Sequence, residues 1–425
     1  MSHAVHSRLA GFHKMSPQMR RATVEQAVGL DAQTMAQLSK PSNLDPDIAD
    51  HMIENMITSI SIPVGIATNM KVDGKDVLVP MATEESSVVA AVCNSARQCY
   101  DSGGFITSLS APLMIAQIQL VHVGDPQAAR LKILEKRTEI QEICDSCDPF
   151  LVKLGGGFRD VEVRVIQAED GPMVITHIIV DTRDAMGANT VNTMAERLAP
   201  SIEVWTGGKV YLRILSNLAD KRLARVRARW ELAAIGGAAV RDGMIAAYRF
   251  AAADPYRAAT HNKGIMNGVS AIVLATGNDT RAVEAGAHAF AARSGRYTSL
   301  SSYEIDADGA LVGTLEMPMP VGLVGGATKI HPTAQAALKI MGVTSAGDLA
   351  RIIVAVGLAQ NFGALKALAT VGIQQGHMAL HAHNIAMAVG ATGDEIEALA
   401  KILVAMRQVR QDVAVTELAR LRGQG

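Results

Sequence analysis

The chain lacks the features that mark several large classes of protein. Its 425 residues include only four cysteines, which is too few for a disulfide framework in a chain of this length. Charged residues make up 19% of the chain, its formal net charge is -1, and no run of basic residues occurs, so we expect no nucleic-acid partner. No GxGxxG motif occurs either, which argues against a Rossmann-type nucleotide fold.

Long apolar runs are also missing. The hydrophobic fraction is 49% and the mean hydropathy is +0.18, but the apolar residues are interrupted by charge. No uninterrupted apolar span reaches the length of about 18 residues that a membrane helix needs. The first eight residues lack the apolar core of a signal peptide. We therefore expect a cytoplasmic protein without a membrane segment, built from two or three domains and acting on small molecules.

Cysteine usage leaves one local alternative open. Cys144 and Cys147 have CxxC spacing, whereas Cys93 and Cys99 are too far apart to form a second such pair. A zinc or redox role for a CxxC pair needs matching partners or a thioredoxin-like context, and the sequence shows neither. We interpret all four cysteines as reduced thiols.

The densest group of functional side chains lies in residues 254–268, DPYRAATHNKGIMNG. This stretch holds an arginine, a histidine, a lysine and two asparagines among small residues. Gly264 and Gly268 would allow a backbone to approach a ligand closely, and Lys263 beside them is an ammonium that becomes electrophilic once water is removed. Alone, such a stretch is also typical of a solvated loop.

Five further motifs follow the order found in one enzyme family. Together with residues 254–268, they make the chain resemble 3-hydroxy-3-methylglutaryl-coenzyme A reductase (HMG-CoA reductase) of the soluble bacterial type, which is class II. The match runs through nearly the whole chain. The motifs are EESSVVA at 84–90, DAMGAN at 184–189, TGND at 276–279, EMPMPVGLVGGA at 316–327 and GHM at 376–378.

The resemblance implies an α+β fold with three units. A large, mainly helical substrate and coenzyme A domain with a central helix and sheet would comprise residues 1–108 and 217–374. A small nucleotide-binding domain, ferredoxin-like and not Rossmann, would be inserted at 109–216. A mobile helical flap would follow at 375–425.

The resemblance also implies four catalytic residues. Lys263 would polarise the thioester carbonyl, and Asp279 would lie beside it to orient the ammonium and share its proton. Glu85 matches the family's catalytic glutamate because Ser-Ser-Val-Val-Ala follows it, while Glu84 would face away. His377 would protonate the departing coenzyme A thiolate. The reaction would reduce HMG-CoA to mevalonate with two hydrides, through a thiohemiacetal and mevaldehyde.

Substrate contacts follow from the same resemblance. Arg257 would pair with the free carboxylate of the substrate, for which a guanidinium fork is suited. Ser87 and Asn267 would bond the substrate's oxygens. His13 and Lys14 are candidates for meeting the phosphates of coenzyme A, which is both part of the substrate and a product.

The cofactor residues are expected in two places. The 184–189 motif places glycine and small residues where a helix begins, and free N–H groups at a helix N-terminus suit a pyrophosphate. Asp148 matches the acidic residue that faces the adenosine ribose in relatives, with Asp145 as its alternative. A carboxylate there accepts from a 2′-hydroxyl and repels a 2′-phosphate, which favours NAD(H) over NADP(H). In the 184–189 motif the expected cofactor-binding residues are Asp184, Met186, Gly187, Ala188 and Asn189.

Local patterns predict several elements. Val72-Asp73-Gly74-Lys75 is typical of a hairpin turn. Apolar residues from Ile48 to Ile57 at helical spacing predict a helix that begins near Asp45. We expect the apolar stripe of this helix to belong to the core or to a subunit interface. Further helices are expected from Thr83, over 125–143, over 185–199 and within 217–250, and strands over 161–166, 173–180, 210–215 and 311–316.

Alternatives remain open at this point. The resemblance to the family implies a homodimer, or a hexamer built as a trimer of dimers, with the site shared between subunits. An NADP-preferring form, or a reductase of another carboxylated acyl-coenzyme A, is the main alternative, and Arg257 favours a substrate with a free carboxylate. A nucleotide-binding scaffold would leave the four catalytic candidates without a joint purpose. His377 and His381 have the i,i+4 spacing of zinc ligands, but no third ligand is evident, so we expect no metal.

Overall fold

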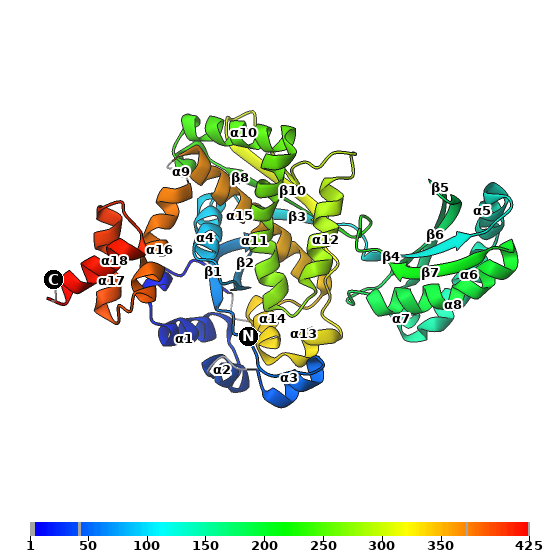
Figure 1. Ribbon diagram of the computed structural model, residues 1–425, viewed down its shortest axis with the longest axis horizontal. Helices are drawn as coiled ribbons and strands as arrows, with labels where there is room; N and C mark the ends of the chain where they lie inside the picture. The colour runs from blue at the N-terminus through cyan, green and yellow to red at the C-terminus, as the bar shows by residue number, and fades with distance from the viewer. Residues whose placement is uncertain (1–4, 41–43, 371–372, 424–425) are drawn as a thin grey trace.

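The structure is a computed structural model that describes residues 5–40, 44–370 and 373–423, with the backbone alone for residues 373–380. It confirms a mixed α+β fold. Figure 1 shows a central body, a smaller sheet-containing unit at one end and three C-terminal helices at the other.

A six-stranded sheet runs through the central body in the order β2-β1-β3-β8-β10-β9. Its neighbouring strands are antiparallel except for β1 and β3, which are parallel. Asp73 and Gly74 join β1 to β2 with φ values of 48° and 79°, so the predicted hairpin turn is confirmed. The strands are β1 (Val64–Val72), β2 (Lys75–Ala82), β3 (Phe105–Leu109), β8 (Leu223–Trp230), β9 (Ser301–Ile305) and β10 (Leu311–Pro318).

Two long helices, α11 (Pro255–Ala275) and α15 (Ala346–Ala369), pack together at the centre of this body. A methyl group added at Gly268 would lie 2.9 Å from Gln360 Cβ and 3.2 Å from the carbonyl oxygen of Val356, and one at Gly357 would lie 2.9 Å from Val269. Glycine on each helix therefore lets the two backbones approach. Gly268 serves this packing, whereas the sequence suggested close approach to a ligand.

The remaining elements of the body surround this pair. Trp230 stacks on Phe362 of α15 with ring centroids 4.1 Å apart, which ties the sheet to the central helix. The elements are η1 (Phe12–Lys14), α1 (Pro17–Val28), α2 (Ala32–Ser39), α3 (Pro46–Met52), α4 (Val88–Cys99), α9 (Leu232–Ile235), α10 (Ala238–Ala253), α12 (Thr280–Ala291), α13 (Gly326–Ile330) and α14 (Pro332–Met341).

Helix α15 is also the one helix within the described ranges that is long and apolar enough, by length and composition, to cross a membrane. In this fold 67% of its most apolar 18-residue window is buried. Ile353, Leu358 and Phe362 are among its fully buried side chains. Packing inside the body accounts for the apolar character of this helix.

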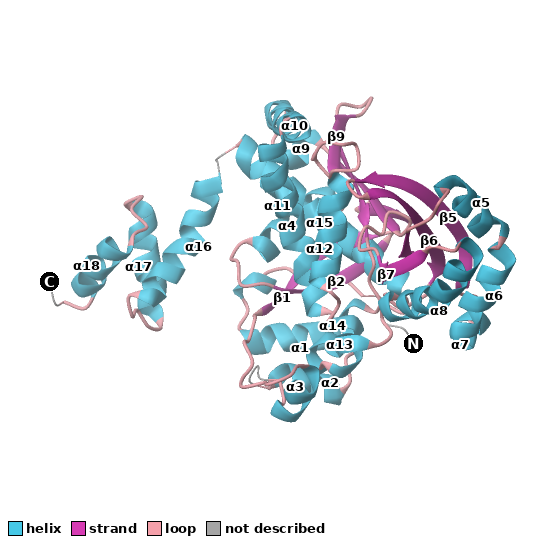
Figure 2. Ribbon diagram, turned by 45° about the vertical axis from the view of Figure 1, so that its right-hand side comes forward, coloured by secondary structure: helices cyan, strands magenta, loops and turns pink. Residues whose placement is uncertain are grey.

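The small unit has a four-stranded antiparallel sheet with its own hydrophobic core. Its strands follow the βαββαβ pattern, with three helices in the first connection and one in the second. The strand order is β5-β6-β4-β7, which is the order of a ferredoxin-like sheet. Figure 2 shows its helices along one face of the sheet. The elements are β4 (Leu113–Val121), α5 (Pro126–Glu135), α6 (Arg137–Cys147), α7 (Pro149–Lys153), β5 (Gly157–Ala168), β6 (Gly171–Asp181), α8 (Ala188–Thr206) and β7 (Lys209–Leu215).

The C-terminal unit consists of α16 (Ile373–Ala388), α17 (Asp394–Ala405) and α18 (Gln411–Leu421). Leu399, Leu403 and Leu418 form a separate small core with Ala382 and Ala386. The three units thus each bury their own apolar side chains.

Several predicted element boundaries were wrong. The expected helix over 125–143 is two helices, because Lys136 leaves helical geometry at φ -91° and ψ 20°. The stretch 217–250 begins with β8, whose alternating apolar and arginine side chains fit a strand. Helix α4 begins at Val88 and not at Thr83, since Ser87 has a left-handed φ of 75°.

The predicted apolar helix stripe at 48–57 is also wrong. Helix α3 ends at Met52, and Ile53 is extended with φ -142°. Ile57 and Ile60 are 93% and 91% exposed in the single chain, so they do not belong to its core.

Candidate active site

Three predicted residues from distant segments meet in one cluster. The Lys263 ammonium donates to Glu85 Oε2 at 3.0 Å, and Asn267 Nδ2 donates to the same oxygen at 3.3 Å. Lys263 and Asn267 are four residues apart on α11, so both side chains leave the same face of that helix. The Lys263 side chain is 62% exposed and that of Glu85 39%, so the cluster is open to a ligand.

Glu85 comes from the short connection between β2 and α4. Its backbone N–H donates to Thr83 Oγ1 at 3.2 Å, which fixes the turn. Ser87 caps α4 with φ 75°, so Glu85 lies two residues before the helix N-cap. Glu84 is exposed. The turn thus directs Glu85 towards α11.

Arg257 lies six residues before Lys263 on α11. Burial lowers the pKa of its guanidinium, which remains charged at neutral pH. Within the described ranges, no hydrogen bond or ion pair engages that guanidinium. A half-buried cation of this kind suits an anionic ligand group.

Asp279 lies at the start of α12. Its Oδ1 caps α12 by accepting from the Ala282 N–H at 3.1 Å, and it lies 3.6 Å from Arg281 Nε. The ion pairs of the described residues join Lys263 to Glu85 and do not join it to Asp279. Asn278 beside it accepts from the Gly322 N–H at 2.8 Å, which links this turn to residues 321–324.

Four candidates contribute less structural detail. His377 falls within the backbone of α16, but its side chain lies outside the described residues. Ser87 is half-buried at the start of α4. His13 and Lys14 are exposed and both lie in η1.

The 184–189 motif forms the turn into α8. Gly187 caps the helix with φ 99°, and a methyl group there would lie 2.4 Å from Thr182, so glycine is required on both counts. No side chain caps this helix end, which leaves the N–H groups of Ala188 and Asn189 without a side-chain cap. The helix end fits an anionic group such as a pyrophosphate.

Asp184 and Met186 fasten this turn to the large body. Asp184 Oδ1 accepts from the Ala346 N–H at 2.8 Å, and the Asp184 carbonyl accepts from the Leu323 N–H at 2.9 Å. The Met186 carbonyl accepts from Arg222 at 3.2 Å. These contacts make the turn at 184–189 part of the junction between the two units.

The two acidic residues that are candidates for contacting the ribose, Asp148 and Asp145, differ in the hydrogen bonds that their carboxylates already accept. Asp148 Oδ1 caps α7 through the Leu151 N–H at 2.9 Å, and no bond of its Oδ2 occurs in the described part of the chain. Asp145 uses Oδ1 for the Phe158 N–H at 2.8 Å, and its Oδ2 accepts from Gln141 at 3.5 Å. Asp148 therefore keeps more acceptor capacity for a ligand.

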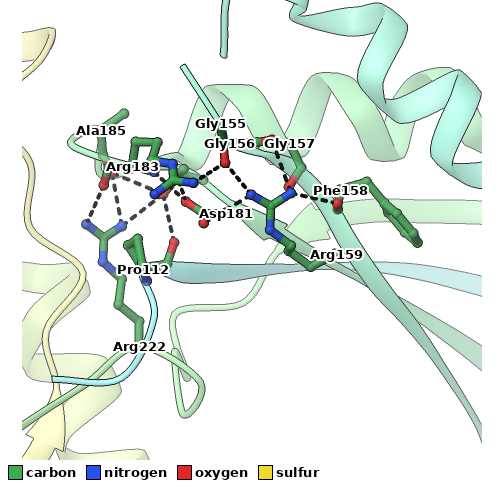
Figure 3. Close-up of polar contacts among 11 residues, drawn as sticks. Pro112, Gly155, Gly156, Gly157, Phe158, Arg159, Asp181, Arg183, Ala185 and Arg222 are labelled. Carbon is green, nitrogen blue, oxygen red and sulfur yellow. Dashed lines mark hydrogen bonds and ion pairs between the residues drawn. The ribbon is translucent and has the colours of Figure 1, made fainter. Parts of the chain in front are cut away.

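Sequence reasoning missed three arginines next to this turn. Figure 3 shows Arg159 and Arg183 converging on the Gly155 carbonyl, with Asp181 at 3.3 Å and 3.4 Å from their nitrogens. Arg222 lies on the other side of the turn and is buried. Their partners are mostly backbone carbonyls, which carry no residue signature, so no motif could have identified them.

Neither the cysteines nor the histidines gather into a metal cluster within the described residues. Burial raises the pKa of Cys144 to about 12, which makes it a poor source of thiolate. His383 bonds Glu397 at 2.7 Å between α16 and α17.

Comparisons with known proteins show which family this chain is similar to. The family model of hydroxymethylglutaryl-coenzyme A reductase matches residues 16–382. The chain is 55% identical to 3-hydroxy-3-methylglutaryl-coenzyme A reductase of Archaeoglobus fulgidus over 99% of this chain and 96% of that protein. It is 39% identical to a probable reductase of Borreliella burgdorferi over 81% of this chain and 79% of that protein.

Solved structures give the same result. The reductase of Streptococcus pneumoniae matches with a TM-score of 0.84 and 40% identity, covering 97% of this chain and 99% of that one. A class II reductase from the same organism, solved bound to NADPH, matches with a TM-score of 0.83 and 40% identity, covering 85% and 99%.

Proposed function

This chain belongs to the hydroxymethylglutaryl-coenzyme A reductase family in its class II form, and from that premise we propose how its residues carry out the reaction. As a reductase of this family it interconverts HMG-CoA with mevalonate and coenzyme A. The observation that carries the assignment of roles is the convergence of Lys263, Asn267 and Glu85.

Lys263 stabilises the negative charge that develops on the thioester oxygen. An ammonium held at that point resembles one donor of an oxyanion hole, which contributes about 10²–10³ in rate. Glu85 holds the Lys263 ammonium and supplies a proton to the oxygen as the alcohol forms. Asp279, from the turn linked to Gly322, supports the ammonium when substrate fills the site.

The substrate's free carboxylate pairs with Arg257, and Asn267 and Ser87 bond its oxygens. Arg257 has the charge and partial burial that such a contact needs. His377, brought over the site by the C-terminal unit, protonates the departing thiolate after the thiohemiacetal collapses to mevaldehyde. Residues 375–425 therefore act as a flap, residues 109–216 as the nucleotide domain, and residues 1–108 and 217–374 as the substrate domain.

The nucleotide lies between Asp148 and the turn at 184–189. The uncapped N-terminus of α8 accepts its pyrophosphate, and Asp148 accepts from the ribose hydroxyls. The nicotinamide cofactor supplies the two hydrides. Because a second negative charge near Asp148 is unfavourable, we favour NAD(H).

One observation favours NADP(H) as the second candidate. Arg159 and Arg183 share the single carboxylate of Asp181. The three side chains together therefore keep a net positive charge near the turn at 184–189. A 2′-phosphate that reached these guanidiniums would bind them well. A relative solved with NADPH shows that class II reductases can bind that cofactor.

The test is an absorbance assay of the reduced nicotinamide with purified protein. HMG-CoA should oxidise NADH, and mevalonate with coenzyme A should reduce NAD⁺. NADPH and NADP⁺ run in parallel measure the preference, and glutaryl-coenzyme A probes the acyl group. Absence of turnover in both directions with either cofactor would contradict the proposal.

A further inference from the structure

A buried arginine lies where the chain returns from the small unit to the large body. Arg222 immediately precedes β8 and is only 6% exposed. Burial lowers the pKa of its guanidinium to about 10, while Asp181 and Asp184 raise it, so the group is charged at neutral pH. A buried cation is unfavourable unless its donors are bonded, so its partners define its role.

Arg222 bonds neutral oxygens on both sides of the junction. Its Nη1 donates to Thr182 Oγ1 at 3.0 Å, to the Ala185 carbonyl at 2.9 Å and to the Met186 carbonyl at 3.2 Å. Its Nη2 donates to the Arg183 carbonyl at 3.4 Å and to the Val321 carbonyl at 2.7 Å. Figure 3 shows the guanidinium beside Ala185 at this turn. One side chain thus joins the turn at 182–186 to Val321 of the large body.

The same bonds orient the turn towards α8. In a planar trans peptide the C=O and N–H groups point in opposite directions. Because Arg222 holds the Met186 carbonyl, the Gly187 N–H that shares that peptide points away from Arg222. Gly187 is the N-cap of α8, where we place the pyrophosphate.

The large-body side of the junction continues to the catalytic turn. A methyl group at Gly322 would lie 2.4 Å from the Met186 nitrogen, so the two backbones are in close contact. The Gly322 N–H donates to Asn278 Oδ1 at 2.8 Å, and Asn278 Nδ2 donates to Thr276 Oγ1 at 3.1 Å. Asp279 is the next residue. A continuous set of bonded groups therefore runs from the nucleotide turn to the turn that holds Asp279.

We propose that Arg222 is a positioning residue that fixes the nucleotide turn 182–186 to Val321, and so sets the place of the bound nicotinamide relative to the catalytic turn at 276–279. This inference rests on the proposed function. Arg222 does not touch the substrate or the reacting atoms. Its effect passes through the backbone carbonyls that it holds.

The test compares three variants with the wild-type enzyme. Arg222→Lys keeps the charge but cannot reproduce the planar set of donors. Thr182→Val removes one acceptor and keeps the size of the side chain. Arg227→Met, on the exposed face of β8, is the matched control for loss of an arginine. Kd for the reduced nicotinamide cofactor is measured by fluorescence titration, and KM and kcat are measured for both substrates.

We expect Arg222→Lys to raise Kd and KM for the nucleotide at least about tenfold, with KM for HMG-CoA changed by less than about twofold. Thr182→Val should raise the nucleotide constants about threefold, and Arg227→Met should leave them unchanged. A merely structural role would lower the melting temperature without this selective change. In a fourth variant, Arg222→Ala, added guanidinium ion should restore the nucleotide affinity that the substitution removes.

Two outcomes would overturn the inference. One is wild-type nucleotide affinity in both Arg222→Lys and Thr182→Val. The other is an equal rise of KM for nucleotide and for HMG-CoA. Failure of the proposed function looks different, because the wild-type enzyme itself would then bind no reduced nicotinamide and show no turnover. If Arg222→Lys does not fold, the Thr182→Val measurement decides alone.

Discussion

At the scale of single residues, Lys263 decides whether the cluster on α11 is catalytic. We predict that Lys263→Met lowers kcat about 10²–10³-fold, because the developing oxyanion loses its positively charged donor. Nucleotide affinity should stay the same. The measurement is steady-state turnover of HMG-CoA, with Lys132→Met on the exposed side of α5 as the control. A loss of less than about tenfold would remove Lys263 from the chemistry.

Asp148 supports the second prediction at this scale. Two unit charges about 4 Å apart at an effective dielectric constant near 20 repel by about 4 kcal/mol, so a partly screened carboxylate should still discriminate at least about tenfold. Asp148→Gly should shift the ratio of kcat/KM for NADPH over NADH upwards by at least that factor. Glycine is tolerated at a helix N-cap, so α7 should persist.

Asp145→Asn is the matched control for this prediction, because it removes the same charge and keeps an acceptor for the Phe158 N–H. The cofactor ratio of Asp145→Asn should equal that of the wild-type enzyme. If Asp145→Asn shifts the ratio and Asp148→Gly does not, the ribose contact belongs to Asp145.

Some residues of the candidate site could be predicted from the sequence and others could not. Glu85, Lys263 and Asn267 belong to recognisable motifs, and the structure brings them together. The partner of Lys263 could not be predicted, because the contact depends on the turn before α4. Arg222 was missed because it acts on backbone carbonyls, which any sequence provides.

At the scale of elements, helix α11 connects the site to the core. Gly268 packs against α15, whereas the nearest atom to a methyl group at Gly264 would be Ala364 Cβ at 4.0 Å. We predict that Gly268→Ala destabilises the protein by about 1–3 kcal/mol through overpacking. Gly264→Ala should stabilise it by about 0.5–1 kcal/mol, because alanine is the better helix former.

Urea unfolding of the two variants measures this difference directly. Both replace glycine by alanine in one helix, so helix propensity is matched and only the space differs. Equal shifts of the unfolding midpoint would mean that α11 and α15 are not packed as closely as the structure shows.

Elements with a clear local signal were predicted well. The hairpin at Asp73 and Gly74 and the strand β10 follow from turn chemistry and alternation. The strand β8 was missed although Leu223–Trp230 alternates apolar and arginine residues, because the arginine-rich composition suggested a helix. The break between α5 and α6 at Lys136 contains neither glycine nor proline, so the sequence could not predict it.

At the scale of the whole molecule, the order of motifs predicted a small unit inserted into a large one. In the structure this segment has its own four-stranded sheet, in the order β5-β6-β4-β7, and its own core. The sequence could not predict the junction between the small unit and the large body. It is formed by Asp184, Arg222 and Gly322, which lie far apart in the chain and meet only after both units have folded.

The exposed isoleucines before β1 provide the last prediction. The apolar stripe that ends at Ile57 was predicted to be either core or subunit interface. In the structure Ile57 and the nearby Ile60 are both exposed in the single chain, so neither belongs to its core. Covering one such side chain contributes about 1.5–3 kcal/mol, which favours a homodimer through this segment. Ile60→Lys should therefore yield monomers in light scattering. Val204→Lys, at an equally exposed apolar position on α8, should leave assembly unchanged. A dimer that survives both Ile57→Lys and Ile60→Lys would place the interface elsewhere.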